Sequence, residues 1–589
     1  MTVPHLFTNF VGSATPPIGT WYFEPEFSQH AYGTPDYQNL KRNIEPVGAV
    51  CLDGSGNVYT LFTMSEGNTQ TSTHGSAFIV LVKTNSSGVR QWSRFIYGNN
   101  RIFAFGMDID NTNHRIYICG STQQNADGTT SNNQTNESLG WVCRIDSINT
   151  STPSVSWSKY LAADQTSTRT TGNSNAFGVT LRSIKVNPVN GYIFAIGTSY
   201  GYYGAGLGTG SGTNWSDPQA TLMFRFDVGS GSTQECKIIN PVGLGNVDSI
   251  TGVQTIVNPH NITVDSSGYV YALFEWDRSD GGTDFKDGIL VAKFSSDTNL
   301  NMQDCWEISA GVGDERSLGK FEIDSSDNFH ITYQGATTDF FKSNCSTYLM
   351  ANSSRVAQRT KRFQRYVASG SPYYSNQTHA LCGSTHIYLI SSLYSFSQMN
   401  SIWVQKKQIG SDTVDQEYII ENQLTDDVND NDAKIASIEA ACDGTYLYLT
   451  IKTDSTQYPN SANTSVAGRE NSSYLLQLPV ADFSSSLPSS VPTKWSNRVR
   501  SNGWDGFEGD NKLTIKAKDW TPSTYGVADL STSSSSVSWT SLGTNSSDYS
   551  GNDTGASMTS FNFSTFTMSA TITTEGGSNV DLTTIKTEI

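Results

Sequence analysis

The sequence has few charged residues, no long apolar run and no clustered cysteines. Only 15% of its 589 residues are Asp, Glu, Lys or Arg, and 36% are hydrophobic. Helical bundles need many Ala, Leu, Glu and Lys residues, so this Ser-, Thr-, Asn- and Gly-rich composition favours short strands joined by polar turns. No stretch approaches the roughly 18 apolar residues that span a membrane, so we expect no membrane insertion.

Basic residues are also scarce, since the formal net charge is −17. A nucleic-acid-binding surface needs a basic patch or stripe, which makes nucleic acid an unexpected partner. The densest basic segment, Arg355–Arg365, is interpreted as a solvated pair of strands.

The eight cysteines are scattered, and no C-x-x-C pair occurs. Zinc sites and disulfide frameworks both require clustered cysteines, so we expect buried, reduced thiols. The first ten residues, M-T-V-P-H-L-F-T-N-F, lack the basic start and apolar run of a signal peptide. We therefore expect synthesis in a cytoplasm without export by the usual route.

A hairpin motif recurs along the chain, as in V-C-L-D-G-S-G-N-V-Y-T-L from Val50 and I-T-V-D-S-S-G-Y-V-Y-A-L from Ile262. Apolar residues alternate on both sides of an Asp-to-Gly turn, as half-buried strands require. Asp can accept a hydrogen bond from its own backbone two residues on, and Gly supplies positive φ. Seven copies align, and their turn anchors are Asp53, Asp110, Asn187, Asp265, Asp324, Cys382 and Cys442.

A second hairpin follows each first one, most clearly at Ala77 to Ile96, although the last copy, from Tyr474, is degenerate. Each repeat therefore predicts four up-and-down strands. Seven such units predict an all-β fold, a seven-bladed β-propeller of four-stranded antiparallel blades over residues 45–490. An open row of sandwiches or a β-solenoid is the alternative. The turns D-G-S-G-N-V-Y and D-S-S-G-Y-V-Y resemble the Asp-x-x-Gly-Asn-hydrophobic-Tyr repeats of bacterial and phage propellers, which implies an architecture and not an activity.

The two flanks do not fit the repeat. Residues 1–44 include T-P-P-I-G-T-W-Y-F-E-P-E-F, from Thr15, which predicts an extended arm packed on the propeller or on a neighbouring subunit. Residues 491–589 alternate apolar and polar residues at Leu513–Ala517 and at Ser560–Thr574. This region predicts a small C-terminal β domain or strands that add to a neighbour.

No residue pattern rises to a catalytic or cofactor-binding motif, so we expect no enzyme activity and no cofactor. Gly204–Gly210 lacks the third Gly of a dinucleotide loop, and Gly319-Lys320 lacks the Walker spacing. Thr84–Trp92 keeps the Gly and Trp of the sialidase-type Asp box but not its Ser or Asp. Asp426–Asp432 offers oxygen ligands at alternate positions yet lacks the central Gly and final Glu of a calcium loop, so we favour a solvated acidic loop over a calcium site and assign no metal ligands.

Three function classes fit these observations. The overall texture resembles tail proteins of marine phages, so the leading prediction is a non-enzymatic virion structural protein, a nozzle, baseplate or fibre part of a phage tail. Its partners would be other virion proteins, copies of itself and a host receptor or glycan, and its location the virion. The alternatives are a carbohydrate-binding surface propeller and a propeller enzyme such as a glycosidase or lyase. The enzyme would need carboxylates or histidines at the channel, for which the candidates are Glu275, Glu322 and Glu439.

Overall fold

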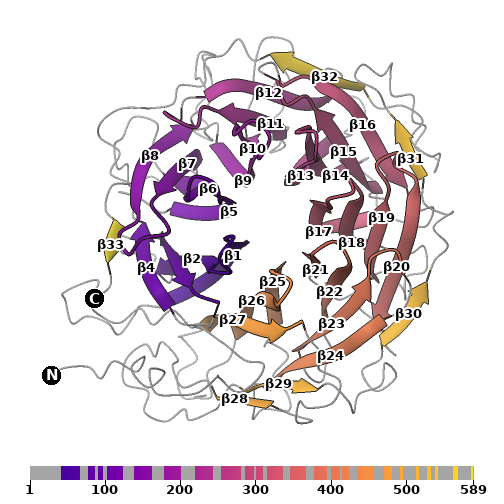
Figure 1. The fold of residues 1–589 in the computed structure, drawn as a ribbon. Helices are drawn as coiled ribbons and strands as arrows, with labels where there is room; N and C mark the ends of the chain where they lie inside the picture. The colour runs from indigo at the N-terminus through magenta and orange to yellow at the C-terminus, as the bar shows by residue number, and fades with distance from the viewer. Residues whose placement is uncertain are drawn as a thin grey trace, which may run out of the picture.

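A computed structural model gives the fold of the protein (Figure 1). It describes residues 42–66, 77–86, 90–96, 102–123, 138–161, 178–200, 219–231, 233–242, 254–279, 286–297, 300–309, 315–335, 345–365, 377–393, 400–411, 414–423, 434–455, 470–480, 491–494, 512–516, 527–531, 538–541, 562–567 and 585–587. Within these ranges every regular element is a strand and no helix occurs. Accordingly, no helix in the described part of the chain could span a membrane.

The strands form six blades of four antiparallel strands around a central opening (Figure 1). Blade 1 contains β1 (Arg42–Leu52), β2 (Val58–Glu66), β3 (Ala77–Thr84) and β4 (Arg90–Ile96). Blade 2 contains β5 (Ile102–Asp110), β6 (Arg115–Gln123), β7 (Ser138–Asp146) and β8 (Ser154–Leu161). Blade 3 contains β9 (Gly178–Val186), β10 (Ile193–Tyr200), β11 (Gln219–Phe226) and β12 (Thr233–Val242).

The other three blades follow the same order, with the first strand innermost. Blade 4 contains β13 (Gln254–Val264), β14 (Val270–Ser279), β15 (Lys286–Phe294) and β16 (Met302–Ser309). Blade 5 contains β17 (Glu315–Ile323), β18 (Phe329–Gly335), β19 (Cys345–Ala351) and β20 (Ala357–Arg365). Blade 6 contains β21 (Gln377–Cys382), β22 (His386–Leu393), β23 (Asn400–Gln408) and β24 (Val414–Gln423). The propeller prediction is therefore confirmed as a fold.

The predicted count of seven four-stranded blades is wrong, because six are found. The seventh repeat forms only β25 (Lys434–Cys442), β26 (Tyr446–Ser455) and β27 (Glu470–Pro479), here called the three-stranded unit. Strand β27 ends at Pro479, whose nitrogen has no hydrogen to donate to a ladder. The next described strand, β28 (Val491–Lys494), joins another sheet, while β27 pairs in parallel with β1 at Asn43 and Asn471. This pairing links the last repeat to the first.

The Asp turn anchors make the hydrogen bonds that the sequence motif predicts. Asp265 Oδ1 accepts from the backbone N–H of Ser267 at 3.0 Å and of Tyr269 at 2.9 Å. Tyr271, in the next strand of the same hairpin, donates its hydroxyl to Asp265 Oδ2 at 3.2 Å. Gly268 has φ of +85°, the left-handed region that glycine tolerates. The motif's Asp, Gly and Tyr thus form one hydrogen-bonded unit.

The hydrophobic cores lie between blades. One core joins Tyr59 and Leu61 of blade 1 to Ile118 and Trp141 of blade 2, and equivalent cores join each later blade to the next, through to the three-stranded unit. A single blade has two apolar faces and can bury them only against its neighbours. Burial of apolar surface between blades is therefore what holds the inner strands in a ring.

The C-terminal region adds strands to the outer edges of the blades. Successive strands pair with blades 6, 5, 4, 3 and 1, which is the reverse of the order in which the blades occur along the chain. These outer strands, drawn in yellow to orange at the rim in Figure 1, are β29 (Lys512–Lys516) on β24, β30 (Val527–Ser531) on β20, β31 (Ser538–Ser541) on β16, β32 (Asn562–Thr567) on β12 and β33 (Ile585–Thr587) on β4. The predicted arm lies outside the described residues except for 42–44, which belong to β1.

Candidate functional site in the central channel

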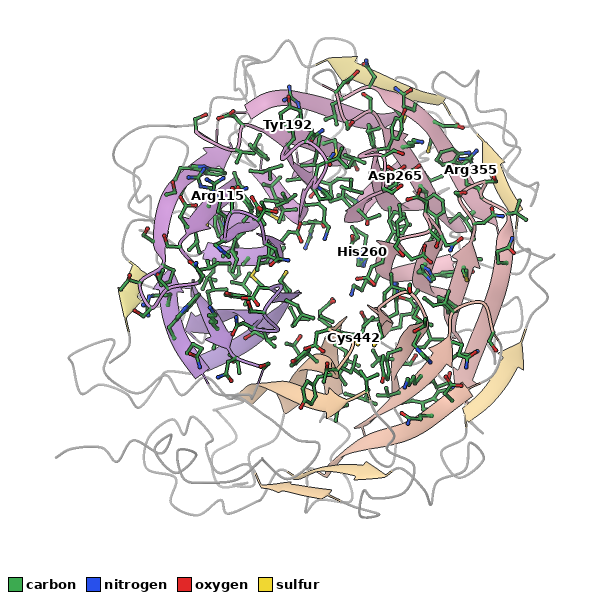
Figure 2. The ribbon with its side chains drawn as sticks, viewed as in Figure 1. Arg115, Tyr192, His260, Asp265, Arg355 and Cys442 are labelled. Carbon is green, nitrogen blue, oxygen red and sulfur yellow. The ribbon has the colours of Figure 1, made fainter. Side chains whose placement is uncertain are left out.

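The inner strands enclose a cavity of about 550 Å³ at the centre of the ring. Its walls come from Thr198 of β10 and from the first strands of blades 1 to 5 and of the three-stranded unit: residues 49–51, 105–108, 182–185, 259–263, 319–322 and 439–440. Figure 2 shows side chains of these strands, His260 among them, around the opening. A volume of this size is typical of small-ligand sites.

The lining residues occupy equivalent positions in the repeats. Cys51, Asp108, Lys185, Thr263 and Glu322 each stand two residues before the turn anchor of their own repeat. Because the blades are related by rotation about the channel, equivalent positions lie at one level of the cavity. The position two residues before each turn anchor therefore forms a ring around the channel. In some repeats this position carries an ionisable residue, namely Asp108, Lys185 and Glu322.

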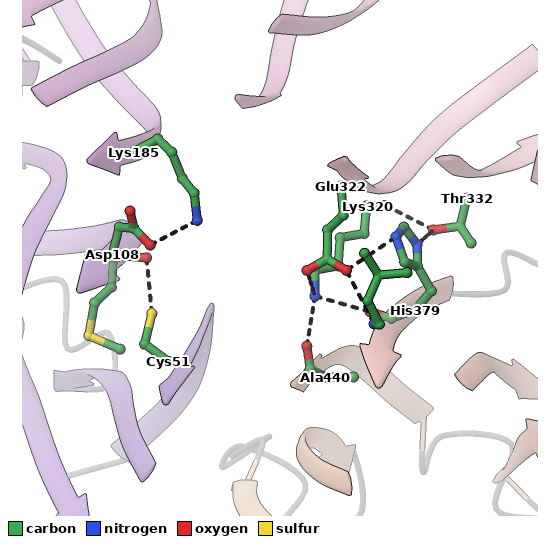
Figure 3. Close-up of polar contacts among 10 residues, drawn as sticks. Cys51, Asp108, Lys185, Lys320, Glu322, Thr332, His379 and Ala440 are labelled. Carbon is green, nitrogen blue, oxygen red and sulfur yellow. Dashed lines mark hydrogen bonds and ion pairs between the residues drawn. The ribbon is translucent and has the colours of Figure 1, made fainter. Parts of the chain in front are cut away.

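One side of the cavity carries an ion pair between neighbouring blades (Figure 3). Lys185 Nζ lies 2.9 Å from Asp108 Oδ1, and the Val186 N–H donates to Asp108 Oδ2 at 2.8 Å. Burial acts to lower the pKa of Lys185, but the attraction of the Asp108 carboxylate is stronger than this effect, and the pKa is raised. The nearby Cys51 thiol donates to the Met107 carbonyl at 3.4 Å, and burial together with Asp108 raises its pKa to about 12. This side presents a fixed cation and an unreactive thiol.

The opposite side is organised by Lys320, which bridges three repeats (Figure 3). Its ammonium group donates to the carbonyls of His379 in blade 6, at 3.0 Å, and of Ala440 in the three-stranded unit, at 2.8 Å. It also lies 2.8 Å from Glu322 Oε1 on its own strand. An ammonium has three donors, and these three acceptors use all of them. Lys320 is thus a fixed positive charge that holds neighbouring groups in place.

Glu322 is held as a carboxylate. Its Oε2 lies 3.5 Å from His379 Nε2 and accepts weakly from the Leu381 N–H at 3.4 Å. Burial alone would raise the pKa of Glu322, but Lys320 and then His379 oppose it, and the pKa falls to about 2. Burial lowers the pKa of His379 to about 3, so His379 is uncharged at neutral pH and Lys320 carries most of the effect.

Glu439 behaves in the opposite way. Burial raises its pKa to about 7, the repulsion of Glu322 adds to the rise, and Lys320 only partly offsets it. No hydrogen bond among the described residues holds its carboxyl group. The cavity thus contains two carboxyl groups whose pKa values differ widely, one ionised and one partly protonated at neutral pH. Such a pair can supply a proton donor and a stable negative charge in one site.

A third group of lining residues comes from the neighbouring blades 2, 3 and 4. The Arg182 guanidinium carbon lies 4.9 Å from the centre of the Phe105 ring. Burial and the charge of Arg182 lower the pKa of His260 to about 4, so this imidazole is neutral at pH 7. Besides Lys185 and Lys320, Arg182 therefore adds a third positive charge to the cavity wall, beside an aromatic face.

The structure brings two of the three proposed carboxylates to the channel. Glu322 and Glu439 line the cavity, whereas Glu275 belongs to β14, the second strand of blade 4. Gly319-Lys320 is no phosphate loop, because a side chain at 319 would approach the Gln377 carbonyl within 2.5 Å, so the glycine serves close strand packing. The segments Gly204–Gly210 and Asp426–Asp432 lie outside the described residues, and no cluster that could hold a metal occurs in the described ones.

Sequence reasoning missed four other lining residues, Asp108, Arg182, Lys185 and His260, and it also missed His379, which contacts Glu322 behind the lining. A signal for them existed, since each stands two to five residues before a turn anchor. In an alignment of the repeats, the positions two to five residues before the anchors would have shown the ionisable residues of the inner strands. Within one strand, in contrast, alternation marks the two blade interfaces and leaves the channel edge undefined.

No protein-family model matches the chain, and no curated protein matches it. Solved structures similar to it include a Hadza microbial sialidase, with TM-score 0.33 over 72% of this chain and 77% of that chain. They also include the NanB sialidase from Streptococcus pneumoniae, with TM-score 0.32 over 77% and 70%, and the intramolecular trans-sialidase from Ruminococcus gnavus, with TM-score 0.30 over 74% and 94%. Each is 10% identical to this chain.

These comparisons correct one prediction. The chain was expected not to be an enzyme, yet the solved structures it is similar to are enzymes by name. At this identity and TM-score the similarity transfers no activity, so a function must come from the residues of the channel. The virion location and the predicted partners stay predictions, since neither the structure nor the comparisons test them.

Proposed function

We propose that the protein is a glycan-acting propeller, a glycosidase whose site is the central channel. The observation that carries the proposal is the carboxyl pair, with the pKa of Glu439 raised to about 7 and that of Glu322 lowered to about 2. Glycosidases cleave with two carboxyl groups, one that protonates the leaving oxygen and one that is ionised. The proposal adopts the enzyme alternative that the sequence left open.

Each carboxyl group has a distinct role in this mechanism. Glu439 gives its proton to the glycosidic oxygen as the bond to the sugar carbon breaks. Glu322 remains ionised and stabilises the positive charge that develops on the sugar ring. Water then adds to the sugar carbon and returns a proton to Glu439, so one water is consumed for each bond cleaved.

The rest of the cavity suits a polyhydroxylated ligand. Asn261, Thr263 and Ser183 line it together with Arg182, and all four can hydrogen-bond sugar hydroxyls. Lys320 and His379 touch Glu322 and would position it without contacting the ligand themselves. They are therefore positioning residues in the proposal.

The test is cleavage of a panel of aryl glycosides and oligosaccharides, including hexosides, hexosaminides, uronides and sialosides, measured as released aglycone or reducing ends. We expect one class to be cleaved by the wild type, and Glu439→Gln and Glu322→Gln to lose 100-fold or more of the rate. Asp415→Asn, on the outer strand β24, should keep full activity and is the matched control. Cleavage that both channel variants retain would contradict the site.

Binding without cleavage would instead support the carbohydrate-binding alternative. In that case the same panel, titrated by calorimetry, should show binding that Arg182→Ala weakens. A virion location is an independent proposal, resting on composition and on the resemblance of the repeats to phage propellers. Gold-labelled antibody against the chain on purified particles tests it, and unlabelled intact and disrupted particles would contradict it.

A further inference from the structure

Two cysteines meet where blade 6 packs against the three-stranded unit. Cys382 is the last residue of β21 and Cys442 the last residue of β25, and both occupy the turn-anchor position that most repeats give to Asp or Asn. Both thiols are free, and both belong to the core between these two repeats. Strands β21 and β25 contact each other, so the two thiols lie next to each other, and each shifts the pKa of the other. Substitution of the anchor in two adjacent repeats has thus placed two thiols in contact.

The pair is asymmetric in its surroundings. Cys382 is buried, yet the interaction with the Cys442 thiol lowers its pKa, and the charge of Lys406 acts in the same direction. The pKa of Cys442 is raised by the same interaction with Cys382 and by burial, while the Gly444 N–H acts to lower it. Cys442 is only half-buried, which gives solvent a path to the pair. A thiol whose pKa is lowered, beside one whose pKa is raised, suits thiol–disulfide exchange.

A second cysteine pair provides a contrast. Cys119 and Cys143 lie on the paired strands β6 and β7 of blade 2, both fully buried, but Cys143 belongs to the core shared with blade 1 and Cys119 to the core shared with blade 3, on the other face of the sheet. Burial raises the pKa of each. Their strands are already joined by a ladder, so a bond between them would add no new connection between blades.

We propose that Cys382 and Cys442 are a reversible disulfide-forming site that takes a small disulfide, such as glutathione disulfide, as its oxidant. One thiol of the pair loses its proton and attacks a sulfur of the oxidant, which breaks that S–S bond and releases a glutathione thiolate that takes up a proton. The second thiol loses its proton, attacks the mixed disulfide at the protein sulfur and releases the second glutathione. Two protein thiols and one glutathione disulfide thus give one protein disulfide and two glutathione thiols.

The bond would act as a clasp beside the point where the ring closes. In the described part of the chain, the ladder between β27 and β1 has one residue pair, Asn43–Asn471. A covalent link from β21 to β25 would hold the three-stranded unit to blade 6 even if the pairing between β27 and β1 opened. It would also close a long loop, which restricts the unfolded chain.

The test uses the full-length reduced protein, incubated with glutathione disulfide, alkylated and analysed by peptide mass spectrometry. We expect a Cys382–Cys442 cross-linked peptide, lighter by two hydrogens, that dithiothreitol reverses, and Cys119 and Cys143 alkylated only after denaturation. Cys442→Ser should instead leave glutathione on Cys382. Two free thiols after prolonged incubation, or disulfides to other cysteines, would overturn the site.

A second measurement tests the clasp itself. The oxidised wild type should have a Tm a few degrees above that of the reduced protein, and the Cys382→Ser/Cys442→Ser variant should not respond to the oxidant. A disulfide that forms without any change in Tm would overturn the clasp. Because neither readout involves a glycan, failure of this proposal leaves the proposed glycosidase site untouched, and the reverse also holds.

Discussion

At the scale of single residues, the channel is defined by charge more than by shape. Glu322 and Glu439 lie in the same cavity, yet their pKa values move in opposite directions because only Glu322 directly contacts Lys320. One lysine, satisfied by two backbone carbonyls and one carboxylate, thus decides which of the two groups is ionised. The acid–base asymmetry follows from where Lys320 is anchored.

The raised pKa of Glu439 has a consequence for stability. Its folded pKa of about 7 exceeds the ordinary value of 4.5, so the folded state binds more protons between these values. Stability is therefore lost as the pH rises from about 4.5 to 7. Glu439→Gln removes the buried charge, and we expect it to unfold like the wild type at pH 4 but to be more stable at pH 8, by about 2–3 kcal/mol.

Urea unfolding at pH 4 and pH 8 measures this difference, with Gln303→Ala, at an exposed and uncharged position of β16, as the control that should follow the wild type at both. A Glu439→Gln variant less stable than the wild type at pH 8 would show that the carboxylate is well solvated or paired, contrary to the description of the cavity.

At the scale of elements, the recurring hairpin explains why the fold could be read from the sequence. The turn Asp accepts hydrogen bonds from the backbone and from a Tyr of the next strand, as Asp53 does from Ser55, Asn57 and Tyr59. His330 takes the place of that Tyr beside Asp324 at 3.1 Å. The anchor therefore joins the first two strands of a blade at their ends.

Asp265→Ala should remove three accepted hydrogen bonds and leave the N–H groups of Ser267 and Tyr269 and the Tyr271 hydroxyl without this acceptor. We expect a loss of about 2–4 kcal/mol, since each bond contributes roughly 1 kcal/mol. The lower urea midpoint measures it, and Asp265→Asn should recover part of the loss. Gln303→Ala, at an exposed position of β16, is the control, and equal midpoints for Asp265→Ala and Gln303→Ala would disprove the anchor's role.

The strands and the propeller could be predicted because Asp, Gly and alternating apolar residues repeat together. The blade count could not, because a degenerate copy such as that from Tyr474 looks like a shorter version of its neighbours until its pairing is seen. Alternation in Leu513–Ala517 predicted a strand but gave no indication of the edge to which it adds. The channel residues were obscured because both faces of an inner strand meet a neighbouring blade, so period-2 patterning carries no signal for the channel edge.

At the scale of the whole molecule, the C-terminal strands cover the outer edges of five blades. Exposed edge strands present unpaired N–H and C=O groups that pair readily with other chains. The outer strands β29 to β33 satisfy these groups on β24, β20, β16, β12 and β4. The rim therefore protects the ring against edge-to-edge association.

A chain truncated after residue 490 should expose those five edges. We expect it to associate at concentrations where the full chain does not, and light scattering coupled to size-exclusion chromatography measures this. Adding the separate segment 491–589 should reverse the association if the strands act by pairing. A truncated chain that stays monodisperse with an unchanged Tm would show that the outer strands are dispensable.

The central claim is that the channel carries acid–base chemistry on glycans. The most direct test is the pH dependence of cleavage by the wild type and Glu439→Gln on the best substrate of the panel. The account predicts activity that falls above a midpoint near pH 7, as Glu439 loses its proton, and a variant that is nearly inactive at every pH. No cleavage of any glycan at any pH, or a Glu439→Gln variant with the wild-type profile, would contradict it.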